Sequence, residues 1–177
     1  MSRAVGFTLV ELAVVLAIIG ILLLTATPAM QGLLLDARRT RTLNALLHGL
    51  HTARAESIRS SADVVLCPTA DGTTCGNSRE DWNQGWMVFV NRDADEPAAR
   101  DSDERIVLRH DYEEMAALNA NRARFLYRPH ARRATAGTLV YCDRRGPSAA
   151  RAVIVSYTGR PRVASVDASG DPLVCGG

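Results

Sequence analysis

The chain has 177 residues, a length typical of a single domain. Hydrophobic residues make up 47% of it and charged residues 23%, a globular balance that excludes a disordered or collagen-like chain. The net charge is only +2, so overall charge does not indicate a nucleic-acid binder. Aromatic residues make up 5%, too few for a base-stacking module of the usual kind.

An apolar segment of 21 residues, 7–27, contains a single charged residue, Glu11. About 20 apolar residues in a helix span the hydrocarbon core of a bilayer, so we expect a transmembrane helix. A cleaved secretory signal peptide is the alternative, but its apolar region is shorter, about 7–15 residues, and carries no carboxylate. Because an ionised side chain inside a membrane needs a partner, Glu11 is a candidate functional residue.

The segment Gly6-Phe7-Thr8-Leu9-Val10-Glu11-Leu12 resembles the processing and assembly motif of type IV pilins and type II secretion pseudopilins. The resemblance implies that residues 1–6 are a leader peptide, which a prepilin peptidase removes after Gly6 before it methylates the new amino terminus at Phe7. It also implies that Glu11 neutralises the terminal amine of a neighbouring pilin subunit. That pairing agrees with the need of an intramembrane carboxylate for a cation.

Residues 28–61 have the pattern of an amphipathic helix. Pro28 removes one backbone donor and predicts a kink or an unwound stretch after Thr27. Leucine residues and Ile58 then recur at intervals of three, four and seven, with arginine residues between them. We expect this helix to end near Ser60, where two serines weaken it and a β-rich segment begins.

Short segments rich in β-branched or alternating residues follow, with turn residues between them, and predict an antiparallel sheet. They are residues 64–67, 86–90, 106–109, 124–128, 138–142, 151–157 and 162–166. A long helix followed by such strands predicts an α+β fold, in which the β-rich head of residues 62–177 covers one side of the helix. Residues 91–103 are polar and contain Pro97, which indicates an exposed loop.

Four cysteines lie in the head: Cys67, Cys75, Cys142 and Cys175. An even number beyond a membrane segment favours disulfides, and four cysteines allow three pairings among which the sequence does not choose. The turn-rich loop from Cys67 to Cys75 could close on itself, which would leave Cys142 to hold the tail through Cys175. A zinc site is the alternative, but the pairs lack the two-residue spacing of zinc knuckles.

The resemblance extends into the head. Similarity to minor pilins and pseudopilins of the FimT/GspH type is carried by residues 53–58 (ARAESI), 65–68 (VLCP) and 85–89 (GWMVF), with Trp82. Closer similarity to FimT and FimU minor pilins than to GspH is carried by residues 125–127 (FLY), 141–146 (YCDRRG) and 152–163 (AVIVSYTGRPRV). The resemblance implies a type IV pilin-like fold in which the amino-terminal helix packs on the head.

Charge is sorted along the head. Residues 79–114 hold 5 Arg and 11 acidic residues, a net charge of −6, whereas residues 122–162 hold 10 Arg and one Asp, a net charge of +9. Clustered arginines supply phosphate contacts, which bind strongly at low salt and weakly at high salt. The alternative is that these arginines pair with the acidic segment of residues 79–114, called the acidic loop below, or form a solvated surface.

The segment Gly159-Arg160-Pro161-Arg162 resembles the Gly-Arg-x-Arg motif with which FimT-type pilins of natural transformation bind DNA. The resemblance implies that Gly159, Arg160 and Arg162 form a DNA-binding turn. Contacts of arginine forks with phosphates would be independent of sequence. Three further arginines are candidate supports if the strands bring them to the same face: Arg144, Arg145 and Arg151.

These observations predict a minor pilin of a type IV pilus, held in the inner membrane by a single helix with its head in the periplasm, and later part of the filament at the cell surface. The partners expected are other pilins, prepilin peptidase and, through the arginines, extracellular duplex DNA. The alternative is a GspH-type pseudopilin of type II secretion, without a DNA role. We expect no enzyme, cofactor or metal, since no nucleophile, base and orienter combine and His48 and His51 lack a third ligand.

Overall fold

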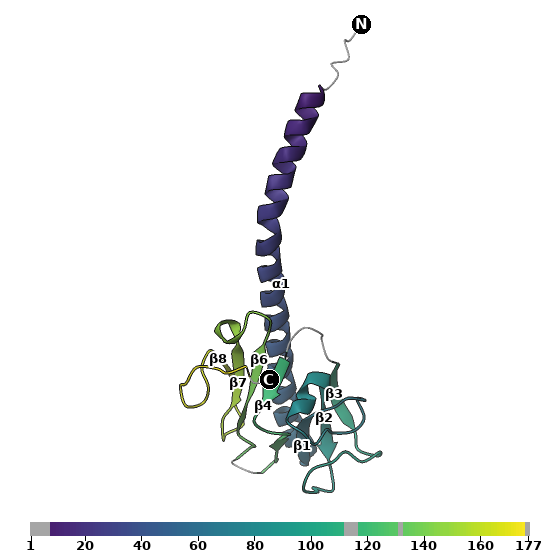
Figure 1. The fold of residues 1–177 in the computed structure, drawn as a ribbon. Helices are drawn as coiled ribbons and strands as arrows, with labels where there is room; N and C mark the ends of the chain where they lie inside the picture. The colour runs from purple at the N-terminus through teal and green to yellow at the C-terminus, as the bar shows by residue number, and fades with distance from the viewer. Residues whose placement is uncertain (1–7, 112–116, 131–132, 176–177) are drawn as a thin grey trace. The chain divides into compact units, whose positions relative to one another are not determined.

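The computed structural model describes residues 8–111, 117–130 and 133–175. A single α-helix, α1 (Leu9–Ser60), is followed by strands and two short 3-10 helices, η1 (Glu80–Gln84) and η2 (Pro147–Ala149) (Figure 1). The chain divides into two compact units, residues 1–40 and 41–177. Each unit is described by itself below.

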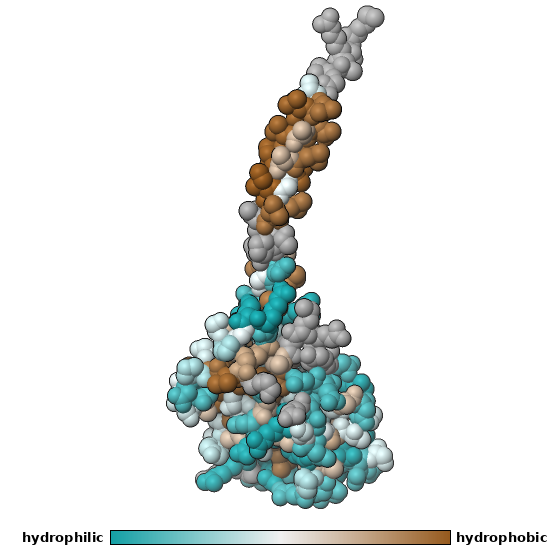
Figure 2. Space-filling view, viewed as in Figure 1, coloured by the Kyte–Doolittle hydropathy of each residue, from teal (hydrophilic) through white to brown (hydrophobic). Residues whose placement is uncertain are grey.

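The first unit contains the part of α1 from Leu9 to Thr40. All the large apolar side chains between Leu9 and Leu24 are exposed, and they form the continuous hydrophobic band in Figure 2. A helix that is apolar on every side requires a lipid or protein environment. Within the part of the chain that the structure describes, no helix meets the length and apolarity needed to cross a membrane.

Helix α1 passes through Pro28 without interruption, so the predicted unwound stretch after Thr27 is absent from this structure. A proline removes one backbone hydrogen bond, and the long helical segments on either side retain theirs. The last helical residue is Ser60, and Ser61 follows with a φ of 50°, a left-handed conformation that ends a helix.

The second unit holds two four-stranded antiparallel sheets. One sheet has the strand order β3-β2-β1-β5, formed by β1 (Asp63–Pro68), β2 (Gly85–Asn91), β3 (Ile106–Asp111) and β5 (Phe125–Tyr127). The other has the order β4-β6-β7-β8, formed by β4 (Ala117–Ala120), β6 (Gly137–Cys142), β7 (Arg151–Val155) and β8 (Pro161–Ala164). Figure 1 shows these two sheets on either side of the lower part of α1.

One apolar core joins the helix to both sheets. From α1 it receives Leu43, Leu46, Leu50 and Ala53, which follow the helical period of one face. The sheets contribute alternate residues of their strands, among them Val64, Leu66, Trp86 and Val88 of the first sheet and Leu139, Tyr141, Val153 and Val155 of the second. Burial of this face on both sheets is what fixes the head around the helix.

Two smaller clusters cover the other faces of the sheets. Val65, Cys67, Met87 and Phe89 pack with Ala98 from the loop after β2. Cys142, Ala152 and Ile154 pack with Leu173 near the carboxy terminus. The loop and the tail therefore act as covers for strands that would otherwise expose apolar side chains.

The α+β fold and all seven predicted strands are confirmed, with end points that differ by a few residues. The strands are divided between two sheets, which the pattern of alternation does not reveal. Strand β4 is not expected from the sequence, because Ala117–Ala120 contains no β-branched residue. It forms because it pairs with β6 along its whole length and because Asn83 Oδ1 accepts a hydrogen bond from the backbone N–H of Leu118 at 2.6 Å.

Candidate functional site

The amino-terminal motif is described from Thr8 onward, and Gly6 and Phe7 lie outside the described residues. Thr8 and Glu11 form a capping box at the start of α1. The backbone N–H of Glu11 donates to Thr8 Oγ1 at 3.2 Å, and the backbone N–H of Thr8 donates to Glu11 Oε2 at 3.3 Å. Sequence reasoning missed this local role of Glu11, although Thr-x-x-Glu before an apolar run is its signature.

The structure contains two disulfides, which correspond to one of the three cysteine pairings that the sequence allows. Cys67 is bonded to Cys75, and Cys142 is bonded to Cys175. The first closes the turn-rich loop after β1, and the second ties the tail to the end of β6. Among the described residues, no cysteine is free and no three His, Cys, Asp or Glu side chains gather in a way that could hold a metal ion.

The predicted DNA-binding motif forms the tip of the β7–β8 hairpin. The backbone N–H of Gly159 donates to Ser156 O at 2.8 Å, and the N–H of Ser156 donates to Arg160 O at 3.1 Å. Gly159 has a φ of 72°, the left-handed position that ends a three-residue hairpin loop. A Cβ at Gly159 would lie 2.8 Å from Tyr127 Cε1, so glycine is also required by the close approach of this ring.

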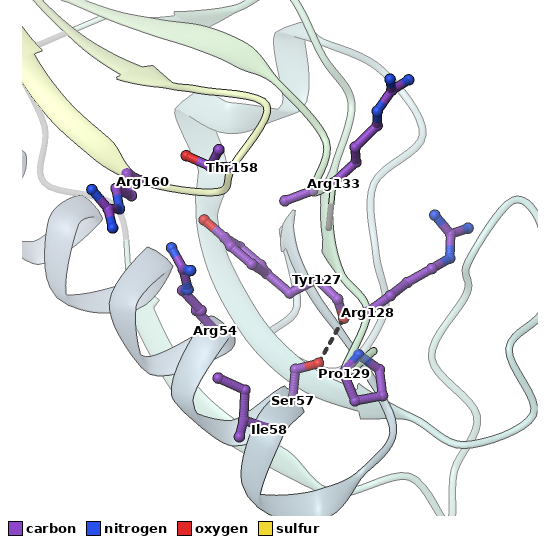
Figure 3. A pocket seen from close by; sticks show the side chains of 10 residues that line it. Arg54, Ser57, Ile58, Tyr127, Arg128, Pro129, Arg133, Thr158 and Arg160 are labelled. Carbon is purple, nitrogen blue, oxygen red and sulfur yellow. Dashed lines mark hydrogen bonds between the residues drawn. The ribbon is translucent and has the colours of Figure 1, made fainter. Parts of the chain in front are cut away.

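A pocket of about 490 Å³ lies beside this tip, between α1, β5 and the hairpin (Figure 3). The described residues of its lining include no carboxylate and four arginines: Arg54, Arg128, Arg133 and Arg160. Tyr127, which is 4% exposed, forms its floor, and its O–H donates to Gly159 O at 3.3 Å. Ser57 Oγ of α1 donates to Tyr127 O at 3.0 Å.

The four arginines of the pocket differ in their partners. Arg128 forms an ion pair with Glu96 of the acidic loop, and its Nε lies 3.5 Å from Asp63 Oδ2. Burial raises the pKa of the Asp63 carboxyl, although the positive charge of Arg128 acts to lower it. Of the described carboxylates, none forms an ion pair with Arg54, Arg133 or Arg160. Arg128 therefore pairs with the acidic loop, whereas the other three arginines keep the pocket positively charged.

The two arginines of the motif face different pockets. Arg160 lines the pocket beside α1, and Arg162 of β8 lines a second pocket together with Arg122, Asn121 and Tyr157. Both side chains are exposed, that of Arg160 in the turn and that of Arg162 in β8.

The predicted supporting arginines lie at the other end of this sheet, which corrects the expectation that they join Arg160. Arg151 begins β7, whereas the hairpin tip follows Val155 at the far end of the strand. Arg145 forms an ion pair with Asp143 at 2.7 Å, and Arg151 donates to the carbonyl of Ala150 at 2.7 Å. Arg144 lies in the same β6–β7 connection.

Comparison with known proteins decides the family. The family model described as Type II transport protein GspH matches residues 42–159, more than half of the chain. The chain belongs to the GspH family. The model of the prokaryotic N-terminal methylation motif matches residues 1–27, so this GspH-family chain combines the amino terminus and the head of a type IV minor pilin or pseudopilin. Membership implies prepilin processing and membrane-anchored assembly with other pilins.

The crystal structure of the type IV minor pilin FimU from Pseudomonas aeruginosa PAO1, space group P65, is similar to this chain. The two are 16% identical with a TM-score of 0.50, and the match covers 76% of this chain and 95% of that one. The crystal structure of the same FimU protein in space group P21 is also 16% identical, with a TM-score of 0.48, and the match covers 76% of this chain and 90% of that one. At this identity the first match shows the type IV pilin fold alone, as predicted. No curated protein sequence matches the chain.

Arg54 is the site residue that sequence reasoning missed. It lies on α1 one turn from Ile58, in a segment that the sequence identifies as amphipathic helix and as similar to the family, without a role for Arg54. Its neighbour Tyr127 is far away in the sequence, so no local spacing indicates the pocket. The available signal is weak: Arg54 falls on the flank of the apolar face of the helix, where a side chain can reach the covering strands.

Proposed function

We propose that this GspH-family chain is a minor pilin of a type IV pilus, and that its head binds duplex DNA without sequence preference. Prepilin peptidase removes residues 1–6 and methylates Phe7, and residues 7–27 then anchor the chain in the inner membrane with the head in the periplasm. In the filament, Glu11 exchanges its capping contact with Thr8 for the terminal amine of a neighbouring subunit. The chain acts as a structural subunit and not as an enzyme.

One observation carries the DNA-binding part of this proposal. The β7–β8 hairpin exposes Arg160 on a turn whose backbone is held by hydrogen bonds and Arg162 on β8, and none of the described carboxylates forms an ion pair with either side chain. Guanidinium groups without a carboxylate partner on a rigid turn are suited to phosphate oxygens, which they contact through two parallel hydrogen bonds. Phosphate contacts position a protein on DNA and carry no sequence information.

The test is a gel-shift titration of duplex DNA with the full chain in a non-ionic detergent, at several salt concentrations. We expect binding that weakens steeply with salt and is largely lost in Arg160→Ala/Arg162→Ala. Arg145→Ala serves as the matched control, because Arg145 is paired with Asp143 at the other end of the sheet. Absence of binding by the unsubstituted chain at low salt would refute the DNA role.

A type II secretion pseudopilin is the second candidate, favoured by the match of residues 42–159 to the GspH model. The two candidates share the amino-terminal helix and differ in the role of the head. Deletion of the gene separates them: loss of DNA uptake with normal protein secretion supports the pilus, and the reverse supports the pseudopilin.

A further inference from the structure

The pocket beside the hairpin tip brings together two arginines from elements that are distant in the sequence. Figure 3 shows the guanidinium groups of Arg54 and Arg160 next to the hydroxyls of Tyr127 and Thr158, whereas Arg128 and Arg133 extend away from this group. Arg54 is half-buried on α1, and Arg160 is exposed on the turn. The resemblance to the DNA-binding motif of FimT-type pilins concerns residues 159–162 and assigns no DNA contact to a residue of the helix.

The part of the pocket that holds Arg54 and Arg160, called the corner below, carries positive charge that no ion pair within the described protein compensates. Arg54 and Arg160 form no ion pair with a described carboxylate, and two cations that line one pocket repel each other. Burial raises the pKa of Tyr127 to about 12, so its phenol is neutral at physiological pH and supplies no negative charge. An anion that enters between the two guanidinium groups relieves this repulsion.

The corner is also held in place before any ligand binds. Ser57 Oγ ties α1 to the backbone of Tyr127, and Tyr127 O–H ties β5 to the carbonyl of Gly159. The N–H of Ala134 donates to Tyr157 O at 2.9 Å, which fixes the turn from a third side. The bases of the two arginine side chains are therefore set by rigid elements, so little ordering is needed when an anion binds.

We propose that Arg54 and Arg160 clamp a single phosphate group between α1 and the β7–β8 turn, with the hydroxyl of Thr158 as a further donor. Guanidinium forks from two directions match the tetrahedral oxygens of phosphate better than a planar carboxylate, which one fork satisfies. The source of the phosphate is the backbone of duplex DNA, a point that rests on the proposed function. Helix α1 thereby becomes part of the nucleic-acid contact surface.

The test uses the full chain in detergent micelles and two probes, inorganic phosphate and a short DNA duplex. We expect phosphate to shift the side-chain NMR signals of Arg54 and Arg160, and Arg54→Gln to weaken DNA binding about tenfold. Loss of one phosphate contact also makes the slope of log K against log salt shallower by about one. Arg144→Gln, the same loss of charge at the other end of the sheet, leaves this slope unchanged.

The two probes separate the failure of the clamp from that of DNA binding. If DNA binds but Arg54→Gln leaves affinity and salt slope unaltered, the clamp is wrong and the proposed function stands. If DNA does not bind, but phosphate shifts both arginine signals and fails to do so in Arg54→Gln, the clamp stands with another source of phosphate. If phosphate shifts neither signal, the clamp is overturned. Unchanged thermal unfolding of Arg54→Gln shows that the fold is intact.

Discussion

Replacement of Gly159 by alanine tests how the hairpin tip is held against Tyr127. The left-handed backbone at a φ of 72° costs a residue with a Cβ about 1–2 kcal/mol, partly offset by about 0.4–1 kcal/mol because alanine restricts the unfolded chain. The new Cβ would also lie 2.8 Å from Tyr127 Cε1 and 3.0 Å from the Cβ of Ala134. Overpacking against a buried ring adds about 1–3 kcal/mol.

We therefore expect Gly159→Ala to lower the free energy of unfolding by about 1–5 kcal/mol. Gly170→Ala is the matched control, because Gly170 has a φ of 96° in a turn closed by the same pair of backbone hydrogen bonds, from Gly170 N–H to Asp167 O and from Asp167 N–H to Asp171 O. No described atom lies within 4 Å of the position that its Cβ would take. Its expected cost is the backbone contribution alone, about 0–1.6 kcal/mol. The difference between the two variants isolates the contact with Tyr127.

The measurement is urea unfolding of the full chain in detergent, followed by tryptophan fluorescence. Both tryptophans, Trp82 and Trp86, are buried in the head, at 1% and 2% exposure, so their emission reports unfolding of this unit. Equal losses of stability in Gly159→Ala and Gly170→Ala would show that the ring of Tyr127 does not restrain the turn. The pocket would then lack the rigid wall on which the phosphate clamp depends.

Two further predictions concern the stability of the head. The Cys142–Cys175 bridge spans 33 positions and the Cys67–Cys75 bridge spans 8, so chain entropy predicts that double alanine variants lose about 3.7 and 2.5 kcal/mol, respectively, in urea unfolding. The reverse order would contradict this reasoning. The pKa of Glu56 is lowered, chiefly by its hydrogen bond to Arg59, so its contribution to stability is fully present above the ordinary pKa of 4.5 and is lost as the pH falls through the lowered value. In acid titrations of unfolding free energy, the unsubstituted protein should therefore lose stability more steeply below pH 4.5 than Glu56→Gln does, and identical slopes would contradict the assignment.

Much of the fold can be predicted because the sequence pattern is local. Apolar residues at helical spacing indicate the buried face of α1, and alternation indicates seven strands. The division into two sheets cannot be predicted in this way, since alternation shows which residues share a face but not which strands pair. Strand β4 depends on contacts made by Asn83 and by β6, which no pattern within Ala117–Ala120 encodes.

The candidate site shows the same limit. The motif at Gly159 is recognised from four adjacent residues, and its turn is as tight as glycine and proline suggest. The predicted supporting arginines do not lie beside Arg160. Arg151 is the first residue of the five-residue strand β7, Arg160 lies beyond the other end of that strand, and a strand rises about 3.3 Å per residue. Two residues at opposite ends of such a strand cannot meet. The length of the predicted strand already contains this information.

The partners of each arginine show how much of the positive charge of residues 122–162 is neutralised within the head. In the described part of residues 122–162, Arg128 and Arg145 are neutralised by carboxylates. Arg122 and Arg151 donate to backbone carbonyls, which orient a guanidinium group without cancelling its charge. Among the described residues, the acidic loop forms an ion pair with Arg128 of the basic segment, whereas none of the described carboxylates forms one with Arg160. The positive charge at the hairpin tip beside α1 is therefore held on a rigid turn and is available to an anion.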